Sequence, residues 1–236
     1  MRKLKGSSNY LKMQTRKYFA RAVLSLILFA LIFAVTGYRM VFQTQSIGVI
    51  EAAGFAAALV CIVVFRYNQQ KYQIYRGGSI GEKNVIKTLT KNLNDNYSLI
   101  NGAHLRGGGG DIDHIVLGPN GVYVLETKNW SGKIQCNGDN WQRPGKHSVG
   151  SPSLQVKRNT QKVKRLIDSS SALRGLNVWV EGIVVFTNQH CSLSINNPTV
   201  PILQLPQLSN YIKRNTNSRL SLEQVQQIAK QIQNES

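Results

Sequence analysis

Two long apolar runs lie near the start of the chain. Residues 22–38 contain no charged side chain, and a bilayer-spanning helix needs about 17–25 such residues. Residues 46–65 form a second run with Glu51 near its start, where a carboxylate reaches the membrane interface at modest cost. The second run alone is ambiguous with a buried helix, but it gains support as the return leg of a hairpin. The pattern predicts a transmembrane helical hairpin, with a single span or a cleaved signal peptide as alternatives.

Basic residues flank the two runs on one side. They are Arg2, Lys3, Lys5, Lys12, Arg16 and Lys17 before the first run, and Arg66, Lys71 and Arg76 after the second. Because cytoplasmic flanks of membrane helices carry an excess of Lys and Arg, we expect both ends of the chain to face the cytosol.

The rest of the chain alternates between helical and strand periods. Helices are predicted over 79–93, 154–174 and 219–234, and Ser79 and Glu82 fit a capping box at the start of the first. Strands are predicted over residues 97–102, 112–117, 122–128, 132–136, 178–186 and 201–204, with a hairpin turn at Asn137-Gly138. Helices around one sheet indicate an α/β sandwich.

The boundaries follow from these patterns. We expect a basic cytosolic N-terminal segment over residues 1–19, a transmembrane hairpin over 20–66, a linker over 67–77 and a folded domain over 78–236.

Charge narrows the choice of partners. The formal net charge is +18, from 29 Lys and Arg against 11 Asp and Glu. The excess is not confined to a tail, because it continues beyond the apolar runs. Such an excess attracts polyanions, so nucleic acid and the anionic membrane leaflet are the two partners to consider. General basicity of the source organism's proteins is the plainer alternative.

Three charged side chains gather on the hairpin of strands 112–117 and 122–128. If Leu117 pairs with Val122, Asp113 faces Glu126; if Asn120-Gly121 forms a two-residue turn, Asp113 faces Lys128 instead. In either register Asp113, Glu126 and Lys128 share one face. A three-residue loop would put Asp113 on the opposite face.

Such a cluster has a chemical use. Two neighbouring carboxylates repel each other and raise each other's pKa, and a divalent cation removes the repulsion. Carboxylate oxygens suit Mg²⁺ or Mn²⁺. Lys128 could position or activate an attacking water and offset negative charge in a transition state. The alternative is a simple salt bridge at the end of the strands.

The surrounding sequence, GDIDHIVLGPNGVYVLETKNWSGKI, resembles the nuclease-related domain (NERD), a branch of the PD-(D/E)xK nuclease superfamily, over roughly residues 78–190. Gly81-Glu82, Asp113, Glu126-Thr127-Lys128 and Gln155 match its motifs in order. The resemblance implies a restriction-endonuclease-like mixed sheet flanked by helices and magnesium-dependent phosphodiester hydrolysis. The expected catalytic residues are Asp113, Glu126, Lys128, Glu82 and Gln155, and the expected metal ligands are Asp113, Glu126 and Thr127.

Other candidates have plainer alternatives. The basic face of the helix over 154–174 could contact phosphates or simply be solvated; its residues are Lys157, Arg158, Lys162 and Lys164. Asp111 could assist the metal or be a solvated loop acid. His114 should point to the opposite face and pack there. Trp130 and Trp141 could stack on unpaired bases, but packing is the expected role.

The sequence therefore predicts a membrane-anchored, Mg²⁺- or Mn²⁺-dependent nuclease on the cytosolic face, acting on nucleic acid, with DNA favoured over RNA but RNA left open. The alternative is a non-catalytic membrane-tethered module that uses the same fold to bind nucleic acid or a protein.

Overall fold

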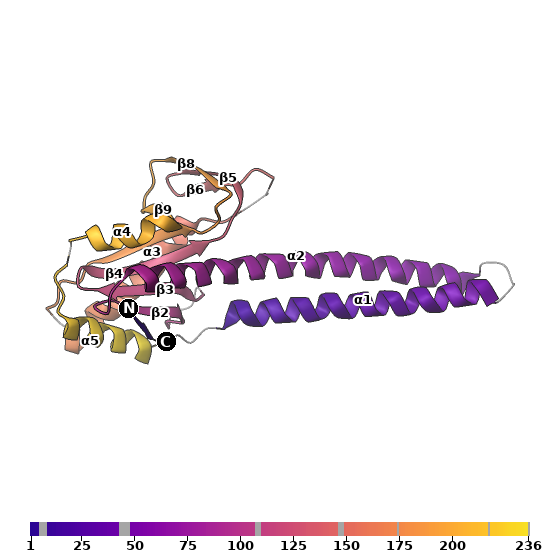
Figure 1. Ribbon diagram of the computed structural model, residues 1–236, viewed down its shortest axis with the longest axis horizontal. Coiled ribbons are helices and arrows are strands. Elements are labelled where there is room, and N and C mark those ends of the chain that lie inside the picture. Colours follow the sequence, from indigo (N-terminus) through magenta and orange to yellow (C-terminus); the bar gives the residue numbers. More distant parts are fainter. Residues whose placement is uncertain are drawn as a thin grey trace. The chain divides into compact units, whose positions relative to one another are not determined.

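The computed structural model describes residues 1–4, 9–42, 48–106, 110–145, 149–173, 175–216 and 218–235. The chain forms two compact units (Figure 1). One is the segment Tyr10–Ser79. The other joins Met1–Asn9 to Ile80–Ser236, so its sequence is interrupted by the first unit.

The unit Tyr10–Ser79 is an antiparallel helical hairpin. It holds α1 (Tyr10–Phe42) and the first part of α2 (Val49–Asn92). Contacts between the two helices follow one antiparallel register, because Arg39 pairs with Glu51 at 3.0 Å near one end, and Tyr18 stacks on Tyr75 near the other, with ring centroids 5.4 Å apart. The predicted pair of apolar helices is confirmed.

Small side chains line the contact between these helices. Ala22 and Thr36 are buried on α1, and Ala58 and Cys61 are buried on α2. A Cβ added at Gly54 would overlap the Oγ1 of Thr36, so this glycine allows the close approach. Interfaces of this kind, built from small residues, are typical of helices that pack inside a membrane.

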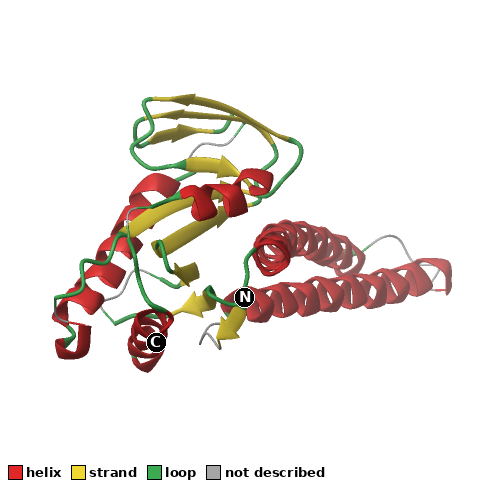
Figure 2. Cartoon of the chain, turned by 60° about the vertical axis from the view of Figure 1, so that its left-hand side comes forward, coloured by secondary structure: helices red, strands yellow, loops and turns green. Residues whose placement is uncertain are grey.

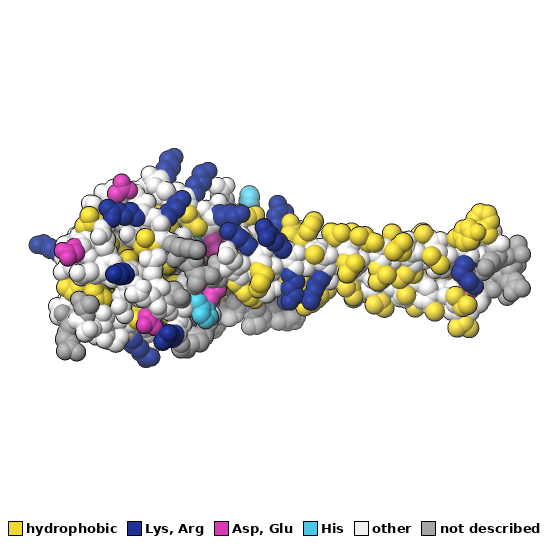
Figure 3. Space-filling view, turned by 90° about the horizontal axis from the view of Figure 1, so that it is seen from below, with side chains coloured by type: hydrophobic (Ala, Val, Ile, Leu, Met, Phe, Trp, Pro, Cys, Tyr) yellow, Lys and Arg dark blue, Asp and Glu magenta, His cyan; other side chains and the backbone are white. Residues whose placement is uncertain are grey.

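The outer surface of the hairpin is apolar. Of the apolar window of each helix, 17% is buried in α1 and 11% in α2, and both helices are long and apolar enough to cross a membrane. Figure 3 shows the apolar side chains along the hairpin. Exposed examples are Leu24, Ile27, Leu31, Phe33, Val35, Leu59, Val60 and Val63. Soluble proteins rarely expose a contiguous apolar surface of this extent.

Helix α2 corrects two predictions. Residues 67–77, expected to be a linker, are helical, and Ser79 and Glu82 lie inside α2, so they form no capping box. Gln, Lys and Arg between the apolar run and Gly77 favour a helix, and each glycine costs only about 1 kcal/mol relative to Ala. A capping box requires a helix to begin there, which the sequence motif alone does not establish.

The second unit is built on a mixed sheet with the strand order β1-β2-β3-β4-β7-β9. Its strands are β1 (Arg2–Leu4), β2 (Ser98–Ala103), β3 (Ile112–Gly118), β4 (Gly121–Lys128), β7 (Val180–Phe186) and β9 (Ile202–Gln204). The pairs β2–β3 and β3–β4 are antiparallel, whereas β1–β2, β4–β7 and β7–β9 are parallel.

Helices cover both faces of this sheet. One face packs against α3 (Pro152–Ser169) and α5 (Leu222–Asn234). The other packs against the end of α2, through Val85, Leu89 and Leu93, and against α4 (Leu205–Arg214). The short 3₁₀ helix η1 (Ser171–Leu173) follows α3. The α/β class and the mixed sheet flanked by helices are confirmed (Figure 2).

A separate three-stranded sheet has the order β6-β5-β8. Its strands are β5 (Gly132–Asn137), β6 (Asn140–Gln142) and β8 (Cys191–Asn196). Asn137 pairs with Asn140, so the turn is Gly138-Asp139, one residue later than predicted. Strand β8 and helix α4 were not predicted.

Strand β1 corrects the prediction for residues 1–19. Residues 1–19 were expected to be a separate basic segment, but Arg2–Leu4 pairs in parallel with β2, Lys3 opposite Leu99, and so belongs to the sheet of the second unit. Two charged residues followed by one apolar residue are too short and too irregular a pattern to predict a strand. Lys5, expected among the flanking basic residues, lies outside the described residues.

Candidate active site

The β3–β4 hairpin sets the position of the charged cluster. Leu117 pairs with Val122, and His114 pairs with Leu125, so one step further along the same register Asp113 faces Glu126. This is the first of the two predicted registers. It is fixed by a two-residue turn at Pro119-Asn120, where the side chain of Asn120 donates a hydrogen bond to the carbonyl of Ile212 on α4.

Asp113 is held by the opposite strand. Its Oδ2 accepts a hydrogen bond of 2.7 Å from the backbone N–H of Thr127. Burial raises the pKa of Asp113 to about 6, against the opposing effects of this hydrogen bond and of Lys128; the charge of Asp111 adds to the rise. The carboxyl is thus less acidic than usual and favours a partner of positive charge.

Glu126 is the most enclosed acid of the cluster, with 2% of its side chain exposed. Its Oε1 accepts a 2.6 Å hydrogen bond from the Nζ of Lys128. Its Oε2 is buried and has no hydrogen-bond partner within the described part of the chain. Burial raises the pKa of Glu126 to about 8, the charges of Asp113 and Glu82 add to the rise, and Lys128 opposes it.

Two elements hold the Lys128 side chain. Its Nζ also lies 3.4 Å from the Oε1 of Gln155, which comes from the first turn of α3. The start of that helix is fixed by Ser151, whose hydroxyl accepts the N–H of Leu154. The structure therefore brings together Asp113, Glu126, Lys128 and Gln155, as the sequence predicted.

Helix α2 approaches the same strand ends at Gly81. A Cβ added there would lie 2.8 Å from the Oγ1 of Thr187, 3.1 Å from the Cβ of Asn129 and 3.4 Å from the Cγ2 of Thr127. The next residue, Glu82, is close enough for its charge to raise the pKa of Glu126. Glycine at position 81 therefore allows α2 to pack directly against the strands that carry the cluster, and it brings Glu82 to the site.

Alternation along β4 separates Thr127 from its neighbours. Glu126 and Lys128 point to the face covered by α3, whereas the side chain of Thr127 points to the face covered by α2, beside Gly81. Only the backbone of Thr127 can face the two carboxylates.

The remaining candidates have structural partners. Asp111 hydrogen-bonds His104 at 2.7 Å. His114 is buried on the opposite face, as predicted, and its Nδ1 lies 2.7 Å from the Oδ1 of Asn101; burial lowers the pKa of His114 to about 3. Trp141 donates from Nε1 to the hydroxyl of Ser153 at 2.9 Å, which agrees with a packing role.

The basic face of α3 is partly neutralised. Lys157 pairs with Asp139 at 2.7 Å, and this ion pair is the main cause that lowers the pKa of Asp139 to about 2. Lys164 pairs with Asp168 at 2.8 Å one helical turn away. Phosphate contacts from Lys157, Arg158, Lys162 and Lys164 therefore stay a prediction, and two of the four compete with carboxylates that the sequence pattern did not connect to them.

Sequence reasoning missed the second role of Trp130. The tryptophan packs on Phe186, with ring centroids 6.0 Å apart, but the Nζ of Lys128 also lies 5.7 Å from the centre of its ring. The signal was present in the spacing, because Lys128 and Trp130 are two residues apart in an extended segment.

The donor set fits a hard divalent cation. Within the described ranges, no three His, Cys, Asp or Glu side chains gather as a metal site, and the two acids that face each other across the hairpin are Asp113 and Glu126. The buried Oε2 of Glu126 without a partner is a position where a cation would satisfy an otherwise costly carboxylate oxygen.

Comparison with known proteins identifies the domain. Residues 77–187 match the family model of the nuclease-related domain, NERD. No curated protein and no solved structure matches the chain. The matched segment runs from the end of α2 to the residue after β7 and contains every member of the cluster.

Proposed function

We propose that this chain, which carries a nuclease-related domain, is a divalent-metal-dependent nuclease that hydrolyses phosphodiester bonds of nucleic acid. The observation that carries the proposal is the pair Asp113 and Glu126, which face each other in a covered site where burial raises both pKa values. Burying two carboxylates and a lysine in one site costs folding free energy, unless a cation or a substrate binds there and pairs with these charges.

In this proposal Asp113 and Glu126 hold the metal, with the backbone of Thr127 beside them. A bound Mg²⁺ or Mn²⁺ supplies positive charge that polarises a phosphate and lowers the pKa of water. Asp113 is oriented for this role by the N–H of Thr127, and Glu126 is oriented by Lys128.

Lys128 supplies charge to the reacting phosphate. Its ammonium is held by Glu126 at 2.6 Å and lies 3.4 Å from Gln155, so it is positioned before substrate arrives. Fixed positive charge in a covered site stabilises the negative charge that develops on phosphate oxygens in the transition state. Gln155 orients Lys128 through its hydrogen bond. The negative charge of Glu82 contributes to the raised pKa of Glu126.

The proposal includes a membrane anchor. Helices α1 and α2 form the two spans, with both ends of the hairpin on the cytosolic side. The pairing of β1 with β2 supports this topology, since strands before and after the hairpin belong to one sheet and must lie on one side of a membrane. The basic residues beside both apolar runs favour the cytosolic side.

A cleavage assay tests the catalytic part of the proposal. Full-length protein in an uncharged detergent should cleave labelled DNA with Mg²⁺ or Mn²⁺ and not with EDTA, and single-stranded and duplex DNA and RNA in parallel identify the substrate. Asp113→Asn and Glu126→Gln should each lower the rate by at least about 100-fold. The control Asp168→Asn, which removes an exposed partner of Lys164, should cleave normally.

Equal cleavage by wild type and by the Asp113→Asn, Glu126→Gln double variant would show a contaminant and overturn the proposal. Binding of nucleic acid without cleavage under every metal condition would instead support the non-catalytic module.

A further inference from the structure

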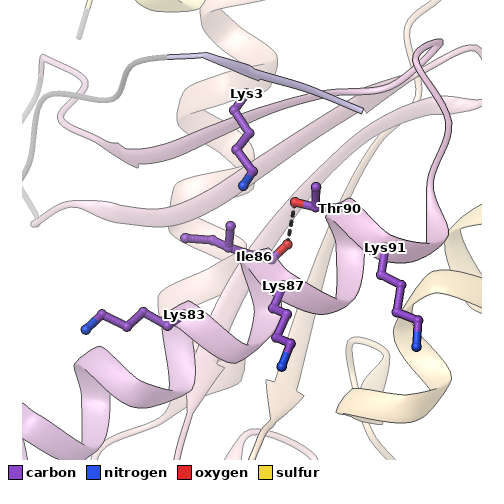
Figure 4. A pocket seen from close by; sticks show the side chains of 6 residues that line it. All are labelled: Lys3, Lys83, Ile86, Lys87, Thr90 and Lys91. Carbon is purple, nitrogen blue, oxygen red and sulfur yellow. Dashed lines mark hydrogen bonds between the residues drawn. The ribbon is translucent and has the colours of Figure 1, made fainter.

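Four lysines surround the part of α2 that packs on the sheet, three on the helix and one on β1. Lys83, Lys87 and Lys91 are exposed on α2, and Lys3 is exposed on β1. Together with Ile86 and Thr90 they line a hollow of about 370 Å³. Figure 4 shows Lys3 reaching from β1 toward α2, while Lys87 and Lys91 leave the helix side by side. The lysine track is defined as Lys3, Lys83, Lys87 and Lys91.

The spacing of the track concentrates charge. Lys83, Lys87 and Lys91 are four residues apart, so they lie on one helix face with a rise of about 6 Å between neighbours. Like charges at this spacing destabilise a helix. Within the residues that the structure describes, no carboxylate lies within 4 Å of any of the four ammonium groups. The track is therefore a concentration of uncompensated positive charge.

The contrast with α3 is direct. Lys157 and Lys164 lie on the helix whose basic face was the sequence's candidate for phosphate contacts, with a solvated face as the alternative, yet each already has an aspartate partner within 2.8 Å. A polyanion that binds α3 must displace those aspartates, whereas the lysine track is open to it.

The track begins beside the proposed active site. Lys83 follows Gly81 and Glu82, and Gly81 packs against Thr127 and Asn129 on either side of Lys128. From Lys83 to Lys91 the helix rises about 12 Å, a length over which one strand of duplex DNA presents about three or four phosphates. A nucleic-acid strand on the track would therefore lie along the exposed side of α2, and the Gly81 end of this segment is the end next to the strands that carry the cluster.

We propose that the lysine track binds the sugar-phosphate backbone of nucleic acid and guides the strand to the cluster of Asp113, Glu126 and Lys128. The proposal rests on the proposed nuclease function for its direction, but binding at the track does not require cleavage. Contacts of this kind go to phosphates, so they confer no sequence preference.

The test measures binding in metal-free buffer. Full-length protein in an uncharged detergent is titrated into a fluorescent DNA oligonucleotide at several salt concentrations. The triple variant Lys83→Gln, Lys87→Gln, Lys91→Gln should raise Kd by about 10-fold or more and lower the slope of log Kd against log salt by about 2 to 3. Gln has a helix propensity close to that of Lys, so the helix should persist.

The matched control removes three exposed basic groups elsewhere, by Lys213→Gln, Arg214→Gln and Lys230→Gln. It has the same net charge as the triple variant, and it should change Kd by less than about 3-fold. Replacing the three track lysines by Arg should preserve binding, which separates charge from a folding defect. Adding Lys3→Gln to the triple variant should lower the salt slope by about one further unit.

Equal losses in the triple variant and its control would overturn the proposal, because binding would then depend on net charge alone. The difference in Kd between the triple variant and its control should also be measured in lipid vesicles. If it persists in phosphatidylcholine vesicles but disappears in vesicles that contain phosphatidylserine, lipid headgroups occupy the track and the proposal is overturned. Track-dependent binding in a protein that never cleaves would uphold the track and overturn the nuclease proposal, so the two failures are distinguishable.

Discussion

The ammonium group of Lys128 lies 5.7 Å from the centre of the Trp130 ring, and the guanidinium of Arg143 lies 5.9 Å from the same ring. One aromatic ring thus attracts two cations. The ring holds Lys128 from the side, while Glu126 and Gln155 hold it through hydrogen bonds. Trp130 is therefore a positioning residue for the lysine that the proposed reaction uses.

Removing this ring should slow cleavage without abolishing it. A cation–π contact contributes about 0.5–2 kcal/mol, so Trp130→Leu should lower kcat by roughly 2- to 30-fold. Trp130→Phe should restore part of the rate, because it keeps a ring. The control Trp179→Leu changes a tryptophan that is 43% exposed and should leave kcat unchanged. An equal loss in the Phe and Leu variants would argue against the cation–π contact.

Lys128→Ala should separate catalysis from metal binding. An ammonium group is no metal ligand, so the variant should lose at least about 100-fold in rate yet keep the calorimetric Mn²⁺ binding of the wild type. Asp113→Asn and Glu126→Gln should weaken both. Calcium should bind but support little turnover, because its looser coordination positions water poorly. If the Asp113→Asn, Glu126→Gln double variant binds Mn²⁺ as well as the wild type does, the assignment of these two residues as metal ligands is wrong.

The metal-free protein should lose stability as pH rises. Glu126 has a folded pKa of about 8, above its usual value, so the folded state binds its proton more tightly than the unfolded state. The stabilisation is fully present below the unfolded pKa of about 4.5 and is lost as pH rises through 8. The melting temperature should therefore fall between about pH 5 and pH 8.

Glu126→Gln isolates this effect from the general charge of the chain. The variant should show a smaller fall in melting temperature across the same pH range, because it has no proton to lose. Mg²⁺ should raise the melting temperature of the wild type more at the upper end of the range, where the carboxylates are free to bind it. Identical pH profiles for the variant and the wild type would contradict the raised pKa of Glu126.

Gly81→Ala should push α2 away from the strand ends. Its Cβ would lie 2.8 Å from the Oγ1 of Thr187, so the free energy of unfolding should fall by about 1–3 kcal/mol. Cleavage should fall with it, because Glu82 moves with the helix. Gly37→Ala, at a position on α1 with no atom within 4 Å of the new carbon, is the control for chemical denaturation. If Gly81→Ala and Gly37→Ala have the same free energy of unfolding, α2 does not approach the strand ends closely enough to exclude a methyl group.

The hairpin should behave as an integral membrane anchor. Full-length protein should stay with the membrane fraction after high salt and after alkaline carbonate, because spanning helices do not depend on electrostatic attraction. Protease added outside intact cells should spare both ends of the chain. Recovery of the full-length protein in the soluble fraction at ordinary salt would show that the hairpin does not span the membrane.

The sequence predicted those parts of the fold that depend on local pattern. The strands around Val116 and Val124 have the apolar runs expected of a covered sheet, and each lies within one residue of its predicted bounds. Asp113, Glu126 and Lys128 came together because the alternation of a strand fixes which side chains share a face. Two registers satisfied that rule, and the contact of Asn120 with Ile212, which is 92 residues away, favours one of them.

The errors came from contacts between distant segments. Strand β1 exists because Arg2–Leu4 finds the edge of β2, and nothing near residue 3 in the sequence indicates that partner. Lys157 looked free because Asp139, its partner, lies 18 residues earlier on a turn. Conversely, the sequence pattern singled out no lysine of α2, and only the structure shows that Lys83, Lys87 and Lys91 have no carboxylate partner among the described residues.

The pairing of β1 with β2 also sets the order in which this protein can fold. About 95 residues separate the two strands, so at roughly 5–20 residues per second the ribosome makes β2 about 5–20 s after β1. In that interval α1 and the apolar part of α2 are already synthesised. In the proposed topology the hairpin can therefore enter a membrane before β1 has its partner β2, and the two strands pair only afterwards.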